Sequence, residues 1–291
     1  MALTEIGIMA HNEAGNLSAL LTVLVSEPEA ARICIVSSGS TDETDQIATS
    51  WAAQHPQIDA IIEPHRRGKA SAINRFLSTL QPDTEAVVLI SGDVLPSPGT
   101  LGRLLAPLDN PAVQMTGGRP CPMNPQTGII NRIVHLQWTM HDRISRARPK
   151  LGEMIAFRPP AVPLEADTIV DEAALEAQFT QNAGELAYVP EAIVHNHGPQ
   201  TLRDLVAQRE RIWIGHKVLL ARTGYRVSTL RIRDLCRPAV EYLLKQPSWI
   251  PVAIAAVTIE IFARLRGTFR YRLQGAMPTV WPVLTSAKIQ P

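Results

Sequence analysis

The sequence is poor in cysteine and lacks an uninterrupted apolar run at its start. Only three cysteines occur among 291 residues, at positions 34, 121 and 236. Three scattered cysteines argue against a disulfide framework and against a cysteine-based metal site. Thr4 and Glu5 interrupt the apolar N-terminus, so the sequence predicts no secretory signal. Together these absences favour a protein of the reducing cytoplasm.

The chain also lacks internal repeats, low-complexity tracts and a large net charge. Its length suffices for one large α/β domain with an appendage, and its 45% hydrophobic content is ordinary for a globular protein. The net charge of +1 conceals an asymmetry, because residues 1–202 carry 13 Lys and Arg against 22 Asp and Glu, whereas residues 203–291 carry 15 against 5. The basic C-terminal third predicts contact with an anionic partner.

An apolar segment in this basic region favours a membrane over nucleic acid as that partner. Residues 249–259 read WIPVAIAAVTI, and these eleven uncharged residues are fewer than the roughly 20 needed to span a bilayer of ~30 Å. Arginines follow directly at 264, 266, 270 and 272, which is typical of an interfacial or re-entrant anchor. The alternative is a buried helix with a solvated basic end. We expect peripheral or monotopic membrane contact through residues 203–291, and no nucleic acid.

Strand and helix patterns alternate over the first 110 residues. Apolar, strand-like runs occur at 6–10, 33–36, 58–62 and 86–90, and helix-like segments occur at 16–24, 41–55 and 68–80. Alternation with short connections predicts an α/β fold whose mainly parallel sheet is flanked by helices. After residue 109 the order becomes irregular. We expect a helix at 131–147, a strand at 153–158, a helix at 167–180, a strand at 188–194 and a long basic helix capped by Thr201.

Three of the apolar runs end in a small polar cluster. The clusters are His11-Asn12-Glu13, the SSGSTD sequence at 37–42, and Ser91-Gly92-Asp93. In an open α/β sheet, ligands bind beyond the carboxyl ends of strands, where backbone N–H groups and short polar side chains converge. SSGSTD alone is also an ordinary helix N-cap. The repetition nevertheless predicts an enzyme that handles an activated, phosphorylated donor.

Two charged residues near these clusters are candidates for binding a diphosphate. Lys69 places an ammonium at a helix start, which suits a phosphate contact, although a solvated surface lysine is the simpler explanation. Asp93 offers one carboxylate beyond an apolar strand. Mg²⁺ or Mn²⁺ takes few oxygens from protein and the rest from phosphates and water. One Asp alone is only a minimal metal site. A simple turn residue is the competing interpretation.

The second half of the chain adds acids and histidines. Asp167, Asp171 and Glu172 surround a predicted helix start, where one of them could accept a proton from an acceptor hydroxyl. Acidic first turns are also common because they suit the helix dipole. His195 and His197 flank a strand end, and alternate strand residues point to opposite faces, so both bind one metal only if the strand has ended.

Six short motifs make residues 4–220 resemble the family-2 glycosyltransferases of the GT-A fold. They occur in the family's order and are AHNEAGNL (10–17), VSSGSTDET (36–44), GKASAIN (68–74), VLISGDVLP (88–96), IVDEAAL (169–175) and QRERIW (208–213). The resemblance implies a GT-A catalytic domain over 1–220, with a nucleotide-binding half at 1–110 and an acceptor half at 111–220. Residues 221–291 would then form a helical, membrane-associating extension. It also implies inverting transfer of a sugar from a nucleotide-sugar to an acceptor hydroxyl.

The same resemblance implies roles for single residues. Asp93 would hold Mg²⁺ or Mn²⁺ against the diphosphate, so that the ion offsets charge on the leaving group. Apart from the resemblance, the strand end makes one of His195 and His197 a second metal candidate, and we take His197. Glu172 or Asp171 would be the general base. Glu172 is favoured because it lies three residues before Leu175, as the family's motif requires. The nucleotide-sugar contacts would be His11, Glu13, Ser38, Asp42, Lys69, Ser91, Gly92, Gln208 and Arg211.

Departures from the family pattern limit what the resemblance implies about the nucleobase, the metal site and the type of transfer. Ser37 and Ser38 stand where the family has paired acids, so uridine specificity is doubtful, and Ser91 replaces the first acid of the metal motif. Ile212 separates Arg211 from Trp213, which argues against a processive polymerase and favours a single or limited transfer. A degenerate nucleotide-binding scaffold and a nucleotidyltransferase are the alternative functions.

The C-terminal EIFARLRG sequence at 260–267 resembles that of membrane-associated members, which act on lipid-linked acceptors or in cell-envelope polysaccharide synthesis. We therefore expect a sugar or lipid-linked acceptor and a location at the cytoplasmic face of the cell membrane.

Overall fold

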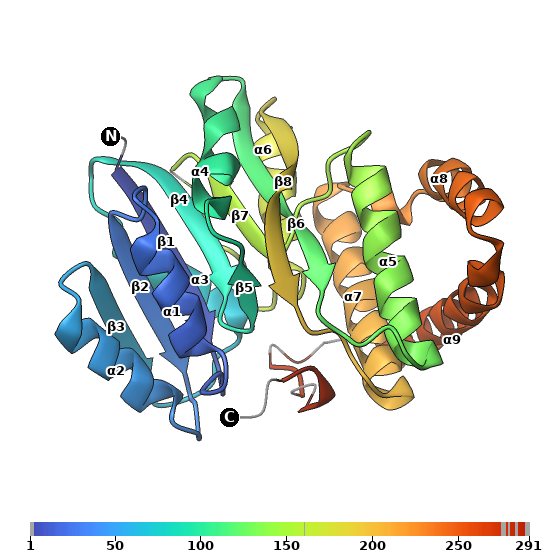
Figure 1. Ribbon diagram of the computed structural model, residues 1–291, viewed down its shortest axis with the longest axis horizontal. Coiled ribbons are helices and arrows are strands. Elements are labelled where there is room, and N and C mark those ends of the chain that lie inside the picture. Colours follow the sequence, from blue (N-terminus) through green and yellow to red (C-terminus); the bar gives the residue numbers. More distant parts are fainter. Residues whose placement is uncertain (1–2, 160, 275–277, 279, 283–284, 289–291) are drawn as a thin grey trace.

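A central sheet of eight strands organises the protein, as the computed structural model in Figure 1 shows. The structure describes residues 3–159, 161–274, 278, 280–282 and 285–288. In these residues the strand order is β3-β2-β1-β4-β7-β6-β8-β5. The strands are β1 Leu3–Ala10, β2 Arg32–Ser38, β3 Ile58–Glu63, β4 Thr84–Ser91, β5 Val94–Pro96, β6 Val113–Pro122, β7 Met154–Phe157 and β8 Glu185–Asn196.

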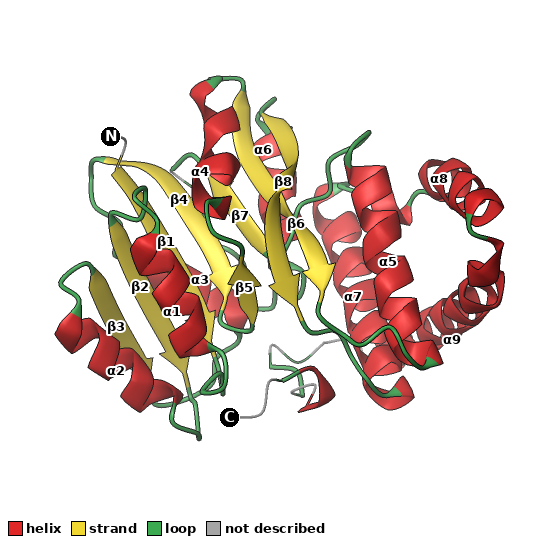
Figure 2. Cartoon of the chain, in the orientation of Figure 1, coloured by secondary structure: helices red, strands yellow, loops and turns green. Residues whose placement is uncertain are grey.

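Helices cover the sheet and extend beyond one end of it (Figure 2). They are α1 Leu17–Ser26, α2 Thr44–Gln54, α3 Lys69–Leu77, α4 Thr100–Leu105, α5 Ile129–Ser145, α6 Asp171–Gln181, α7 Leu202–Thr223, α8 Ile232–Lys245 and α9 Ile250–Gln274. Short 3₁₀ turns occur at Ala106–Asp109, Ser228–Leu230, Pro247–Trp249 and Thr285–Ala287. The predicted α/β fold with a C-terminal helical extension is confirmed.

The first strands are almost wholly apolar because both of their faces are buried. Alternate residues of β1 face opposite cores: Ile6 and Ile8 join the cluster that contains the leucines of α1, whereas Met9 packs with α3 on the other side. At Gly7 a Cβ atom would lie 2.3 Å from the ring of Phe76. Glycine therefore lets α3 approach the sheet closely.

The sheet is parallel on one side and mixed on the other. β3, β2, β1 and β4 are parallel, whereas β7 runs antiparallel to β4, with Ile90 opposite Met154. The carboxyl ends of β1, β2 and β4 thus lie at one edge. Because β7 runs the opposite way, its first residues meet that same edge. This arrangement explains how loops far apart in the sequence come together.

The C-terminal extension contains a longer helix than the sequence analysis predicted. α9 has 25 residues and continues through the charged residues after 259, because Glu260 pairs with Arg209 and Arg264 at 2.7 Å each. Among the described residues, the stretch Pro247–Leu273 is the one with the length and apolar composition of a membrane span; its mean hydropathy is 1.6 and 11% of its most apolar window is buried. The prediction that the apolar segment is too short to span is therefore wrong by these two criteria.

Candidate active site

A cavity of about 780 Å³ opens where the strand ends meet α5, α6 and α7. Asp93, from the end of β4, and Asp171 and Glu172, from the start of α6, all line it. The acids that are about 80 residues apart in the sequence therefore share one cavity. The other predicted residues that line it are His11, Glu13, Ser38, Lys69, Ser91, His197, Gln208 and Arg211.

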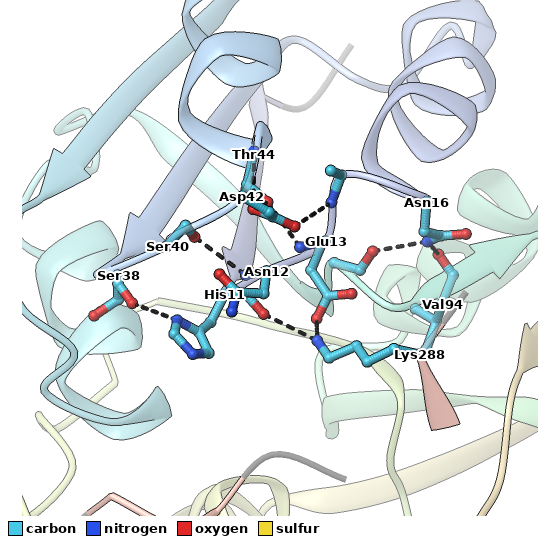
Figure 3. A network of polar contacts seen from close by, with 12 residues as sticks. His11, Asn12, Glu13, Asn16, Ser38, Ser40, Asp42, Thr44, Val94 and Lys288 are labelled. Atoms are coloured by element: carbon cyan, nitrogen blue, oxygen red, sulfur yellow. Dashed lines mark hydrogen bonds and ion pairs between the residues drawn. The ribbon is translucent and has the colours of Figure 1, made fainter. Parts of the chain in front are cut away.

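Asp42 and Gly92 are the two predicted residues that do not line the cavity. They contact the loops that form its wall. One oxygen of Asp42 accepts from Thr44 N at 3.0 Å and the other accepts from Ala14 N at 3.1 Å (Figure 3). Although burial opposes the change, these hydrogen bonds lower the pKa of Asp42 below its usual range. Asp42 thereby joins the loops after β1 and β2. At Gly92 a Cβ atom would lie 2.9 Å from Cγ of Glu13, so glycine makes room for that side chain.

The loop after β1 presents an imidazole and a carboxylate to the cavity. His11 Nδ1 is 2.9 Å from the carbonyl oxygen of Ser38, and burial together with the charge of Arg66 lowers the pKa of this histidine. Burial and the neighbouring Asp93 raise the pKa of Glu13 to about 8, against the opposing effect of Lys288. The Lys288 ammonium donates to the Glu13 carboxylate and, at 2.9 Å, to the carbonyl oxygen of His11 (Figure 3). Nothing in the sequence indicated this contact across 275 positions.

The two candidate bases share one ammonium. Lys69 Nζ lies 2.8 Å from Asp171 Oδ2 and 2.7 Å from Glu172 Oε1. Burial and the charge of Glu172 raise the pKa of Asp171. Burial also acts to raise the pKa of Glu172, but Lys69 and Lys150 outweigh it and lower that pKa to about 2. Glu172 is thus ionised and more accessible than Asp171, with 22% against 9% of its side chain exposed.

Other acids that the sequence analysis considered lie elsewhere or were missed. Asp167 is half-buried and pairs with Arg222 at 2.7 Å, outside the cavity. Glu153 lines the cavity next to the start of β7 and was not predicted as a site residue. Burial and the charges of Asp93 and Glu172 raise its pKa to about 7. The sequence does not show in which direction β7 runs. Because β7 is antiparallel to β4, its first residues lie at the edge where the parallel strands end.

The two histidines of His195-Asn196-His197 have different surroundings. His195 lies within β8, 3.0 Å from Ser97 Oγ, whereas His197 follows the strand end and lines the cavity. No three His, Cys, Asp or Glu side chains of the described residues converge closely enough to hold a metal ion. Asp93 and His197 both line the cavity, so a cation there would take few ligands from protein and the rest from phosphates and water.

The residues from α7 add positive charge. Thr201 caps the helix by accepting from Asp204 N at 3.1 Å, as predicted, and α7 brings Gln208 and Arg211 to the cavity. Burial and the charge of Arg211 lower the pKa of Arg66, which also lines the cavity. Two cations that face one cavity suit an anionic ligand such as a diphosphate.

Trp213 is held away from the cavity by α9. Its indole Nε1 donates to Thr268 Oγ1 at 3.0 Å, and the Arg264 guanidinium lies 4.7 Å from its ring centroid. It is not among the residues that line the cavity.

Comparisons with known proteins place this chain in one family. The sequence model of the family described as Glycosyl transferase family 2 matches residues 5–157. A curated relative, dolichyl-phosphate beta-glucosyltransferase ALG5C of Trichomonas vaginalis, is 29% identical over 99 residues, which is 31% of this chain and 29% of that protein. The match therefore spans less than a third of that relative.

Solved structures show the same fold at low sequence identity. The mannosyltransferase of Pyrobaculum calidifontis, solved with GDP-Man and Mn²⁺, has a TM-score of 0.63 and 19% identity over 95% of this chain and 77% of that one. The glucosyl-3-phosphoglycerate synthase of Mycobacterium tuberculosis, solved with Mn²⁺, UDP-glucose and phosphoglyceric acid, has a TM-score of 0.53 and 21% identity over 78% of this chain and 81% of that one. The chain belongs to glycosyl transferase family 2.

Proposed function

We propose that this family 2 glycosyltransferase moves a sugar from a nucleotide-sugar to an acceptor hydroxyl with inversion, in a single or limited transfer. The observation that carries the proposal is the shared cavity of Asp93 and the Asp171–Glu172 pair. We also retain the division into a catalytic domain over 1–220 and an extension over 221–291 as part of this proposal. The nucleotide-sugars named in the two solved structures support the donor class.

Each part of the donor has a matching part of the cavity. We assign His11 and Ser38 to the nucleoside and Arg66 with Arg211 to the diphosphate, because all four line the cavity. Asp93 and His197 would hold Mg²⁺ or Mn²⁺, which when bound offsets charge on the departing diphosphate. The Ser37 hydroxyl donates to Asp45 Oδ1 at 2.5 Å and is thus engaged within the protein. The part of the cavity that we assign to the nucleoside therefore lacks the paired acids of the family.

Glu172 is proposed as the general base. Its carboxylate takes the proton of the acceptor hydroxyl while the acceptor oxygen forms a bond to the sugar carbon and the bond to the diphosphate breaks. Lys69 orients the carboxylate and keeps it ionised. Asp171 remains the alternative base, although it is the more buried of the two.

Replacing Lys69 with methionine is expected to shift the acidic limb of the pH–rate profile upwards. Without the ammonium, burial raises the pKa of Glu172, so the base is protonated up to a higher pH, and a limb that lies below pH 4 in the wild type moves up by more than about two pH units into the range from pH 4 to 8. Initial rates of transfer from pH 4 to 8 measure this. The control is Arg75→Met, an exposed change on the same helix. An unmoved limb in Lys69→Met would remove Lys69 from control of the base.

The cavity continues from the acids to an apolar wall formed by α5 and by the extension. Apolar side chains of α5, α8 and α9 line that wall, among them Leu136, Met140, Leu235, Leu243, Val257 and Ile261. Such a wall suits an acceptor that carries a hydrocarbon chain, and the name of the dolichyl-phosphate relative supports this class. A sugar acceptor in cell-envelope polysaccharide synthesis is the alternative.

The outer face of α9 supports the proposed membrane contact. Ile254, Leu265, Phe269 and Leu273 are each at least 63% exposed, and basic residues dominate this part of the chain. An apolar face beside arginines suits the anionic cytoplasmic surface of the cell membrane.

The double substitution Leu265→Glu and Phe269→Glu is therefore expected to lower binding to anionic liposomes by about tenfold or more, because it puts two charges on an apolar contact face. Co-sedimentation with vesicles measures the bound fraction. Val162→Glu is the matched control, since Val162 is 64% exposed on a distant loop. Equal sedimentation of the double variant and the control would contradict a contact through α9.

Release of nucleoside diphosphate from a panel of UDP- and GDP-sugars, with and without Mn²⁺, tests the proposed function. A transferase releases nucleoside diphosphate, a nucleotidyltransferase acting in reverse consumes pyrophosphate, and a scaffold binds nucleotide without turnover. Binding is followed in parallel by thermal shift. No stabilisation by any nucleoside diphosphate and no release would contradict the proposal.

A further inference from the structure

We propose that Glu153 supplies the second carboxylate of the cation site, from the strand next to the one that carries Asp93. This inference rests on the proposed function, because it assigns a residue to the same donor site. Neither the sequence analysis nor the comparisons assign a role to Glu153.

The strand register places Glu153 beside the polar cluster that ends β4. Leu89 lies opposite Ile155 and Ile90 lies opposite Met154 in the antiparallel pair of β4 and β7. Glu153 directly precedes Met154, just beyond the paired residues, and so lies at the level of Ser91, two residues before Asp93. A carboxylate on β7 can thus serve a site that lacks an acid at position 91.

The backbone at Glu153 has an unfavourable conformation for its residue type. Its φ is +62°, in the left-handed region that glycine adopts without cost. Residues held this way concentrate at ligand sites, where the surrounding structure enforces the geometry. Glu153 lies between Gly152 and the buried start of β7 at Met154. Both Gly152 and Glu153 line the cavity.

A neighbouring buried amide oxygen has no partner in the described residues. Asn196 is 7% exposed and lines the same cavity, and its Oδ1 atom accepts no hydrogen bond from the described part of the chain. A buried carbonyl oxygen of this kind is costly unless a cation or donor meets it. It is an independent sign of a ligand beside Glu153.

The local charge balance also calls for a cation. The ion pairs among the described residues include neither Asp93 nor Glu153, although the two carboxylates are close enough to interact electrostatically. The ammonium groups that line the cavity have other partners: Lys69 is shared by Asp171 and Glu172, Lys150 pairs with Glu176, and Lys288 pairs with Glu13. Two carboxylates and one amide oxygen match the hard oxygen ligands that Mg²⁺ and Mn²⁺ prefer, and the donor's phosphates with water complete the set.

The test is Mn²⁺ affinity of the full-length protein in the presence of saturating nucleoside diphosphate, measured by electron paramagnetic resonance of free Mn²⁺. Glu153→Gln keeps the size of the side chain and is expected to weaken Mn²⁺ binding by about tenfold or more. Glu185→Gln, an exposed change at the start of β8, is the control and should bind as the wild type does. Glu153→Gln within twofold of wild type would overturn the assignment.

Two further measurements separate a cation ligand from a merely structural residue. In EDTA, Glu153→Gln should bind the nucleoside diphosphate as tightly as wild type or more tightly, because a negative charge has been removed; weaker binding in EDTA would indicate a damaged cavity and contradict the proposal. Ser91→Asp in the Glu153→Gln background should restore most of the Mn²⁺ affinity, since it returns a carboxylate to the opposite strand position. A double variant as weak as the single one would overturn the register argument.

The same experiment distinguishes this inference from the proposed function. If wild type binds neither UDP nor GDP, the donor site itself is wrong. If wild type binds nucleotide and Mn²⁺ and Glu153→Gln does so equally, only the role of Glu153 is wrong.

Discussion

Asp93→Asn is expected to abolish Mn²⁺-dependent transfer, with a loss in kcat of about 1000-fold or more. Asp93, just after β4, is the proposed cation ligand, and an ion held there would contribute several kcal/mol of charge stabilisation to the leaving diphosphate, at about 1.4 kcal/mol for each tenfold in rate. Donor hydrolysis and transfer, each measured against Mn²⁺ concentration, check this result.

Asp83→Asn is the matched control, because Asp83 is an exposed carboxylate just before β4. Thermal unfolding of both variants shows whether the fold is intact. If Asp93→Asn retains full stimulation by Mn²⁺, Asp93 does not hold the cation, and the cation site lies elsewhere in the cavity.

Glu172→Gln is expected to lower kcat by about 100- to 10,000-fold while leaving donor binding nearly unchanged. The amide keeps a hydrogen bond to Lys69 but cannot accept the acceptor's proton, so the loss falls on the chemical step. Single-turnover transfer and the Kd for the donor separate the two effects.

Asp171→Asn is the matched control, because both carboxylates contact the same ammonium. We expect a smaller loss from it, since Asp171 is the more buried carboxylate. If only Asp171→Asn removes transfer, the base is Asp171. If both variants weaken donor binding equally, the pair positions the donor and neither residue is assigned as the base.

Much of the donor half was predictable because its signals are local. An apolar run followed at once by small polar residues indicates a strand end at a ligand edge, and the structure places His11, Ser38 and Asp93 there. Asp42 and Gly92 were harder to interpret. The same pattern describes residues that touch a ligand and residues that hold a loop, and only the hydrogen bonds of Asp42 show that its oxygens are used inside the protein.

Residues whose role depends on packing between distant segments were missed. Lys288 reaches Glu13 from the other end of the chain, and Glu153 reaches the site only because β7 runs antiparallel to β4. The length of α9 was also missed. The neutralisation of Glu260 by Arg209 on α7, which lets the helix continue, is a tertiary contact.

By itself the sequence determined the α/β class, the family and the residues at the strand ends, because each depends on patterns within a few neighbouring positions. Only the tertiary structure decided which of those side chains share a cavity, which are paired, and that Glu153, Asn196 and Lys288 join them. Strand direction, register and the return of the C-terminal segment bring these groups together. Such long-range pairings follow from the packing of the whole chain and leave no periodic trace in the local sequence.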